Sequence, residues 1–186
     1  MAPADNAPSV AHSAIRALLS GGDRRGIAKS NRAREEIERN PALVTELAAL
    51  TDDPDWLVTQ RALDLMEKVA RDHPARIEPH KTIFIGPLAQ SDKWEIRLQI
   101  VRALPLFRWT PAQARRVEEI LIANVSHPQT FVRAWALDGL ATLAEGRPTL
   151  RPVVRRHLRQ FEASSSKALQ ARARHIRARL AKSAAK

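Results

Sequence analysis

The 186-residue chain contains no cysteine and no tyrosine, and aromatic residues make up only 4% of it. The absence of thiols excludes disulfides, thiolate nucleophiles and thiolate metal sites, and it fits a cytoplasmic protein. The scarcity of aromatic rings makes base stacking on single-stranded nucleic acid a weak option. No apolar run approaches the length of a membrane span, and the start MAPADNAPSVAHS lacks the features of a secretory signal. We therefore expect a cytoplasmic protein without a membrane partner.

The net charge of +11 is distributed unevenly along the chain. Residues 1–150 carry 20 Lys or Arg against 19 Asp or Glu, whereas residues 151–186 carry 11 bases against Glu162 alone. Arginine outnumbers lysine 24 to 7, and a planar guanidinium suits phosphate recognition. The Ala- and Arg-rich composition is also typical of codon usage in a GC-rich bacterium. The charge excess alone is therefore weak evidence for a nucleic-acid partner.

A repeat of about 37 residues runs through the chain. Four segments align without gaps, beginning at Val58, Ile96, Val132 and Leu169, at spacings of 38, 36 and 37 residues. Each follows a break rich in helix-capping residues, in which Ser91 and Ser164 are candidate caps. Before each break, apolar residues recur at helical spacing and predict a further helix, over residues 41–50, 79–90, 111–125 and 149–161.

Helix, tight turn and helix, repeated four times, predict an all-α fold, and residues 8–39 supply an irregular first pair. Pro87 and Pro105 fall late in two of these helices, where each predicts a kink or an early end. The Asp-Pro-type turns, and Val132 followed by Ala136 and Leu140, resemble HEAT repeats over residues 40–182. The stretch GGDRR is also similar to one in a group of small bacterial HEAT-repeat proteins, for which no reaction is known.

The resemblance implies a right-handed α-solenoid of about five antiparallel helix pairs. We expect a flexible N-terminus at 1–7, a single HEAT-like domain at 8–182 and a flexible tail at 183–186. The predicted repeats within the domain cover 8–39, 40–72, 73–108, 109–146 and 147–182.

In a HEAT-like array the second helix of each pair lines the concave side. Positions two, six and nine residues after each aligned residue share one helical face, which we take as that side. Its candidate partner-binding residues form a short surface of mixed charge: Gln60, Asp64, Glu67, Leu98, Arg102, Asp138 and His175. Asp64, Arg102 and Asp138 share one offset in consecutive repeats. They predict a ladder of charges that either holds the repeats in register or binds a partner.

Positions five and eight residues after each aligned residue are apolar in the interior repeats, which predicts the surfaces buried between neighbours. In the last repeat these positions carry Arg174 and Arg177. Burying two unpaired guanidinium groups would be costly, so we expect a polar cap there. The other bases exceed what a cap needs and are candidate contacts to an anion or nucleic acid: Arg151, Arg155, Arg156, Arg159, Arg172, Arg179 and Lys182.

The stretch SGGDRRGIAKSN at residues 20–31 raises the question of a phosphate-binding loop. A P-loop needs Lys and Ser or Thr directly after its second glycine, on a strand–loop–helix frame. Two residues intervene here, and the preceding segment predicts a helix. We therefore expect an interhelical loop in which Gly21 and Gly22 end one helix and Asp23 caps the next. A second interpretation is an anion site at the following helix N-terminus, built from Arg24, Arg25 and Lys29.

The sequence predicts no catalytic constellation, no metal site and no cofactor, because its six histidines do not cluster at metal-ligand spacing. Trp135 and Asp138, three residues apart on a candidate concave helix, resemble the aromatic and acidic residues of HEAT-like alkylpurine DNA glycosylases. That family's catalytic set does not transfer residue by residue. The leading hypothesis is a non-catalytic scaffold for a macromolecular partner, with protein favoured. The alternative is a nucleic-acid-binding module that uses the basic C-terminal repeat.

Overall fold

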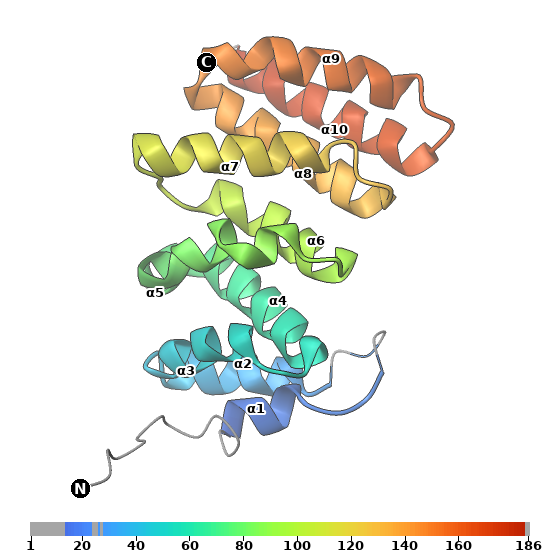
Figure 1. Cartoon of the computed structure of the whole chain (residues 1–186). Coiled ribbons are helices and arrows are strands. Elements are labelled where there is room, and N and C mark those ends of the chain that lie inside the picture. Colours follow the sequence, from blue (N-terminus) through green and yellow to red (C-terminus); the bar gives the residue numbers. More distant parts are fainter. Residues whose placement is uncertain (1–13, 24–25, 27, 185–186) are drawn as a thin grey trace, which may run out of the picture. The chain divides into compact units, whose positions relative to one another are not determined.

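The computed structural model describes residues 14–23, 26 and 28–184, and within them all regular secondary structure is helical (Figure 1). The chain divides into two compact units, Met1–His80 and Lys81–Lys186. A 3-10 segment, η3 (Glu78–Ile85), spans the division.

The N-terminal unit is organised around its longest helix, α4, which contacts α1, α2 and α3. Its elements are α1 (Ala14–Leu19), α2 (Ser30–Arg39), α3 (Leu43–Ala49), a 3-10 turn (Leu50–Asp52), α4 (Trp56–Asp72) and α5 (Pro74–Ile77). Asp55 caps α4, because its carboxylate accepts a hydrogen bond from the Leu57 amide at 2.9 Å. α1 and α2 fall within residues 8–39, where an irregular first pair is predicted.

The C-terminal unit stacks its helices in two layers. Its elements are η4 (Pro87–Gln90), α6 (Trp94–Ala103), η5 (Leu104–Leu106), α7 (Pro111–Asn124), α8 (Thr130–Gly146), η6 (Pro148–Leu150), α9 (Arg151–Glu162) and α10 (Lys167–Ala184). The second helices α6, α8 and α10 lie side by side, since α8 contacts both others. From the other layer, α7 packs against α8, and α9 packs against α8 and α10 (Figure 1).

The apolar positions predicted to lie between repeats are confirmed. The residues five and eight positions after each aligned residue are fully buried, with 0% exposure: Leu63, Met66, Val101, Leu104, Leu137 and Leu140. Arg174 and Arg177, at the same positions of α10, are exposed. The prediction that these positions are apolar and buried in the interior repeats, but carry exposed guanidinium groups in the last one, is therefore confirmed.

Proline shapes the first half of the C-terminal unit, as predicted. The α-helix expected at residues 79–90 is wrong: the segment forms two 3-10 pieces, η3 and η4, which meet at Gly86-Pro87. Pro87 has no amide to donate to the preceding turn, so a continuous α-helix is broken there. α6 ends at Ala103, and a 3-10 turn containing Pro105 follows it.

The two serine caps lie differently from the prediction. The Ser91 hydroxyl accepts from the Lys93 amide at 3.2 Å, which closes a turn before α6 rather than capping it. Ser164 makes the equivalent turn with the Ser166 amide at 3.1 Å. Ser166, directly before α10, is the residue whose hydroxyl faces a first-turn amide, that of Leu169 at 3.5 Å. Three consecutive serines left the cap position ambiguous in the sequence.

Candidate binding surfaces

Side chains from three neighbouring helices meet at Trp135 of α8. The Arg102 guanidinium of α6 lies 5.3 Å from the centroid of the indole ring, and that of Arg172 of α10 lies 4.1 Å from it. Both distances suit a cation–π interaction. Trp135 itself is half-buried. The ring thus contacts two cations and keeps part of its surface open to solvent.

Asp138, one turn after Trp135, ties α8 to α10. Its carboxylate is 3.7 Å from Arg172 Nη1 and 3.4 Å from Arg179 Nη1. Arg179 also donates to the Asp138 carbonyl at 3.1 Å and lies 3.4 Å from Glu145. Asp138 is only 9% exposed, and it holds Arg179 by hydrogen bonds, whereas Arg172 lies within ion-pair distance alone. The Arg172 guanidinium thus contacts both the Asp138 carboxylate and the Trp135 ring.

An exposed aromatic ring lies one turn before Trp135. Phe131 is 58% exposed, and residues four apart on a helix share a face. On α6, the half-buried Leu98 precedes Arg102 by the same spacing. Leu98, Arg102, Phe131, Trp135 and Arg172 together are called the Trp135 surface below. Trp and Arg are the side chains most enriched among residues that dominate binding energy at protein interfaces.

The predicted concave-face residues fall partly on this surface. Leu98 and Arg102 belong to it, Asp138 orders it, and His175 is exposed three residues after Arg172. Gln60 and Asp64 lie in the N-terminal unit, where Asp64 Oδ2 is 2.7 Å from Lys68 Nζ. The predicted ladder from Asp64 to Asp138 would join the two units and stays a prediction.

Glu67 does not reach any surface, because its side chain is fully buried and paired with Arg71. Phe131 was missed, although the sequence carried a signal for it. It lies four residues before Trp135 and outside the positions that pack between repeats.

The candidate anion contacts of the C-terminal unit divide into two groups. Arg172 and Arg179 form ion pairs with Asp138. Arg151, Arg155 and Arg159 recur every four residues on α9 and are exposed. Within the described residues, none of these three forms a hydrogen bond or ion pair with a neighbouring side chain. They are called the α9 arginine stripe below. Lys182 is exposed on α10, and Arg156 Nη2 lies 3.4 Å from His157 Nε2.

Residues 151–186 contain one acidic side chain, that of Glu162. Glu162 binds Arg177 through both of its oxygens. This hydrogen bonding is the largest cause that holds the pKa of Glu162 below its ordinary value. Arg159, the last arginine of the stripe, has a smaller electrostatic interaction with the same carboxylate.

The loop in the opening stretch wraps around a buried arginine. Arg61 of α4 is 2% exposed and donates to four backbone carbonyls. Nη1 reaches those of Leu19 and Gly21, each at 2.7 Å, and Nη2 reaches that of Asp23 at 2.9 Å. The Gly26 carbonyl accepts from both Nε and Nη2, at 3.2 and 3.1 Å. The carbonyl oxygens of this backbone thus point toward a buried cation. The conformation of the loop is therefore explained by its contacts with Arg61, without a bound anion.

The glycines of this loop behave as predicted and the aspartate does not. Gly21 and Gly22 follow α1 with φ of +78° and +72°, a conformation that favours glycine. The prediction that Asp23 caps the next helix is wrong. Its carboxylate accepts from the Gly26 amide at 3.0 Å, and α2 begins only at Ser30. Of the proposed anion site, Lys29 is exposed, whereas Arg24 and Arg25 lie outside the described residues.

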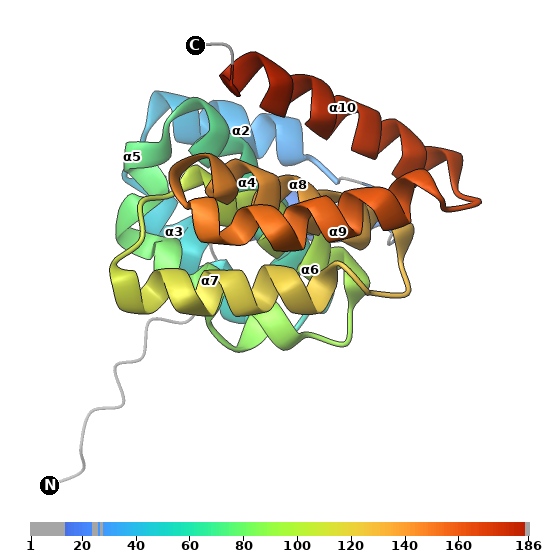
Figure 2. The ribbon, with the colours of Figure 1, turned by 90° about the horizontal axis from the view of Figure 1, so that it is seen from above.

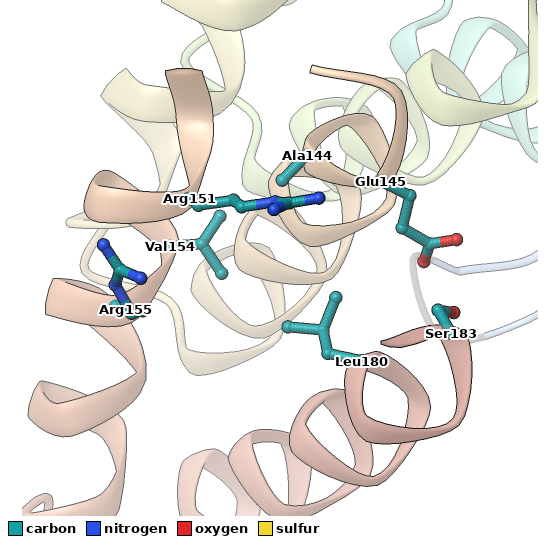
Figure 3. A pocket seen from close by; sticks show the side chains of 7 residues that line it. All are labelled: Ala144, Glu145, Arg151, Val154, Arg155, Leu180 and Ser183. Atoms are coloured by element: carbon teal, nitrogen blue, oxygen red, sulfur yellow. The ribbon is translucent and has the colours of Figure 1, made fainter. Parts of the chain in front are cut away.

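A pocket of about 310 Å³ lies within the C-terminal unit (Figure 3). Its lining residues come from α8, α9 and α10: Ala144, Glu145, Arg151, Val154, Arg155, Leu180 and Ser183. Across residues 14–23, 26 and 28–184, no group of three His, Asp or Glu side chains is placed to hold a metal ion. No helix in that part of the chain has the length and apolarity to cross a membrane.

Comparisons with known proteins show the fold of the chain. No protein-family model matches the sequence, and no curated protein matches it. A designed armadillo repeat protein in complex with the peptide (KR)4 matches 87% of this chain and 78% of its own, at 14% identity and a TM-score of 0.60. An engineered protein matches 91% and 78%, at 16% identity and a TM-score of 0.63.

Computationally designed armadillo repeat proteins for modular peptide recognition match 87% of this chain and 79% of their own. Their identity is 15% and their TM-score 0.60. At these identities the likeness carries the fold alone. The chain has an all-α, armadillo-like helical-repeat fold, which confirms the fold class predicted from the repeats.

Proposed function

We propose that this chain is a non-catalytic binding scaffold and that the Trp135 surface of its C-terminal unit binds a protein partner. The observation that carries the proposal is the convergence of Arg102, Trp135 and Arg172 from three successive helices. Two guanidinium groups flank one partly open indole, and Phe131 stands 58% exposed a turn away. A cytoplasmic location, expected from the absence of cysteine, is part of the same proposal.

The order of this surface supports binding. A partner that contacts Trp135 meets a ring already in contact with two cations, and Asp138 pairs with one of those cations. Little side-chain freedom is then lost on association, which favours affinity. The armadillo-like neighbours include a designed protein in complex with a peptide, so the fold itself is suited to an extended protein ligand.

Selection of a random peptide library displayed on phage, against the whole chain, tests the proposal. We expect the enriched peptides to lose about tenfold or more in affinity with Phe131→Ala, because exposed aromatic anchors dominate such interfaces. Trp135→Ala gives a second measurement. Ile122→Ala is the matched control, since Ile122 is 39% exposed on α7 of the other layer. Peptides that bind Phe131→Ala and Ile122→Ala as tightly as the wild type would contradict the proposal.

A nucleic-acid partner is the second candidate, and the α9 arginine stripe favours it. Successive exposed guanidinium groups on one helical face suit phosphate contacts that depend on salt. Retention of a duplex DNA at low salt should fall when Arg155, Arg156 and Arg159 are changed to Glu. Unchanged retention would remove this candidate.

The glycosylase hypothesis stays a prediction. Asp138, its candidate acidic residue, is engaged by Arg172 and Arg179 and orders the Trp135 surface. Release of a methylated purine from alkylated duplex DNA, abolished by Asp138→Asn, would support an enzyme. No release by the wild-type chain would remove that hypothesis.

A further inference from the structure

Figure 2 shows α9 and α10 diverging from the turn that joins them. The pocket of Figure 3 is lined by the start of α9 and the end of α10, away from that turn. Its wall is apolar on one side. Val154 of α9 and Ala144 of α8 are 1% and 2% exposed, and Leu180 of α10 is half-buried. Figure 3 shows Val154 and Leu180 pointing toward one another across the space. A ligand in this position would gain contact with aliphatic side chains on two helices.

Two arginines make another part of the same pocket positively charged. Arg151 and Arg155 lie one turn apart on α9, and both line the space. In Figure 3 the Arg151 guanidinium extends toward Ala144, over the apolar wall. Neither arginine forms an ion pair or hydrogen bond within the described part of the chain. Their charges are therefore open to a ligand.

The acidic residue of the pocket is already engaged. Glu145 Oε1 lies 3.4 Å from Arg179 Nε, on the α10 side. Two cations and one partly neutralised carboxylate leave a positive excess beside the aliphatic wall. Guanidinium groups bind carboxylates through paired, charge-assisted hydrogen bonds.

We propose that this pocket binds a medium-chain fatty acid, with its carboxylate at Arg151 and Arg155 and its chain between Val154 and Leu180. An amine would meet like charge, and a neutral alkane would leave the cations without a partner. A sugar or nucleotide needs many hydrogen-bond partners, whereas the wall formed by Ala144, Val154 and Leu180 offers none. The site is separate from the Trp135 surface, so its failure and that of the protein-binding proposal are distinguishable.

Titration calorimetry of the whole chain with octanoate tests the site, and octanamide and octylammonium are the comparison ligands. We expect saturable one-to-one binding of octanoate and much weaker binding of the other two. Replacing Arg151 and Arg155 together by Gln should lower the octanoate affinity about tenfold or more, because charge-assisted hydrogen bonds are lost. Arg159→Gln is the matched control: it changes the next arginine of the same stripe, outside the pocket, and should leave the affinity unchanged.

Leu180→Gln removes the aliphatic half of the site at a half-buried position and should also weaken octanoate binding. Methyl resonances of Val154 and Leu180 should shift on titration of the wild type. Three results would overturn the proposal: no saturation up to about 10 mM octanoate, equal affinity for octanamide, or an equal loss in Arg159→Gln. Binding of a leucine-terminated peptide without binding of octanoate would also overturn it.

Discussion

Arginines in the two units differ in what their guanidinium groups contact. Arg61, in the N-terminal unit, is 2% exposed and donates to the carbonyl of Leu19 at the end of α1 and to three carbonyls of the loop that follows. The α9 arginine stripe, in the C-terminal unit, is exposed and has no such acceptors. The same side chain therefore determines a backbone conformation in one unit and is open to a ligand in the other. Burial and acceptors, rather than charge, separate the two roles.

Removing Arg61 should have the largest effect on stability. Arg61→Ala removes the Arg61 donor from four carbonyls, of which that of Asp23 keeps the Gly26 amide, and leaves a void beside the loop. We expect the free energy of unfolding to fall by about 3 kcal/mol, from lost hydrogen bonds and packing. Urea denaturation followed by circular dichroism measures it. The matched control is Arg32→Ala, an exposed arginine of α2 in the same unit.

Arg61→Lys sharpens this test, since a single ammonium cannot reach four carbonyls at once. It should lie between the wild type and Arg61→Ala. Equal urea midpoints for Arg61→Ala and Arg32→Ala would show that the loop does not depend on the buried guanidinium.

A half-buried arginine should have an intermediate effect. The Arg172 side chain is 23% exposed and contacts both Asp138 and the Trp135 ring. Arg172→Ala should lower the free energy of unfolding by about 1 kcal/mol, because a partly solvated ion pair and one cation–π contact are lost. The control is Arg174→Ala, exposed on the same helix. A loss in Arg174→Ala as large as that in Arg172→Ala would contradict the ordering role of this cluster.

The Arg16–Asp53 pair adds a dependence on pH in the N-terminal unit. Arg16 Nε and Nη2 donate to the two oxygens of Asp53 at 2.6 and 3.1 Å. The hydrogen bond from Arg16 is the largest cause that lowers the pKa of Asp53. A lowered carboxyl pKa contributes stability above the unfolded-state value, about 3.9, and this contribution is lost as pH falls through the folded-state pKa.

Urea midpoints between about pH 6 and about pH 2 should therefore fall less steeply in Asp53→Asn than in the wild type. Asp52→Asn is the control, because Asp52 is exposed next to the pair. Identical slopes in the wild type and Asp53→Asn would contradict the pairing.

The fold could be predicted from the sequence because the pattern that specifies it is local. Apolar residues at helical spacing, repeated every 36 to 38 residues, predicted the second helices and their buried positions such as Leu137 and Leu140. The 3-10 segments at residues 78–90 could not be predicted in the same way. A proline indicates that an α-helix is interrupted, but it does not determine which conformation takes the place of that helix. Cap positions were uncertain for a similar reason, since neighbouring serines compete for the same amides.

The roles of individual charges could not be read from the sequence. Arg61 and Glu67 lie on a helix that the repeat pattern identifies, yet both are buried because partners hold them. The partners of Arg61 are backbone carbonyls of a loop some 40 residues earlier, and no periodicity points to them. Trp135 posed the same difficulty, since its partners come from the helices before and after it.

The exposed arginines should have the smallest effect on stability, and this result decides whether the comparison holds. Changing Arg151, Arg155 and Arg159 together to Gln should alter the free energy of unfolding by no more than about 0.5 kcal/mol, because surface charges without partners add little. Urea denaturation of the triple variant measures it, beside a triple change at Arg32, Arg108 and Arg115, which are also exposed. A loss above about 1 kcal/mol would mean that the stripe supports the fold. Its arginines would then need no ligand to explain them, and both the nucleic-acid and the fatty-acid proposals would lose their basis.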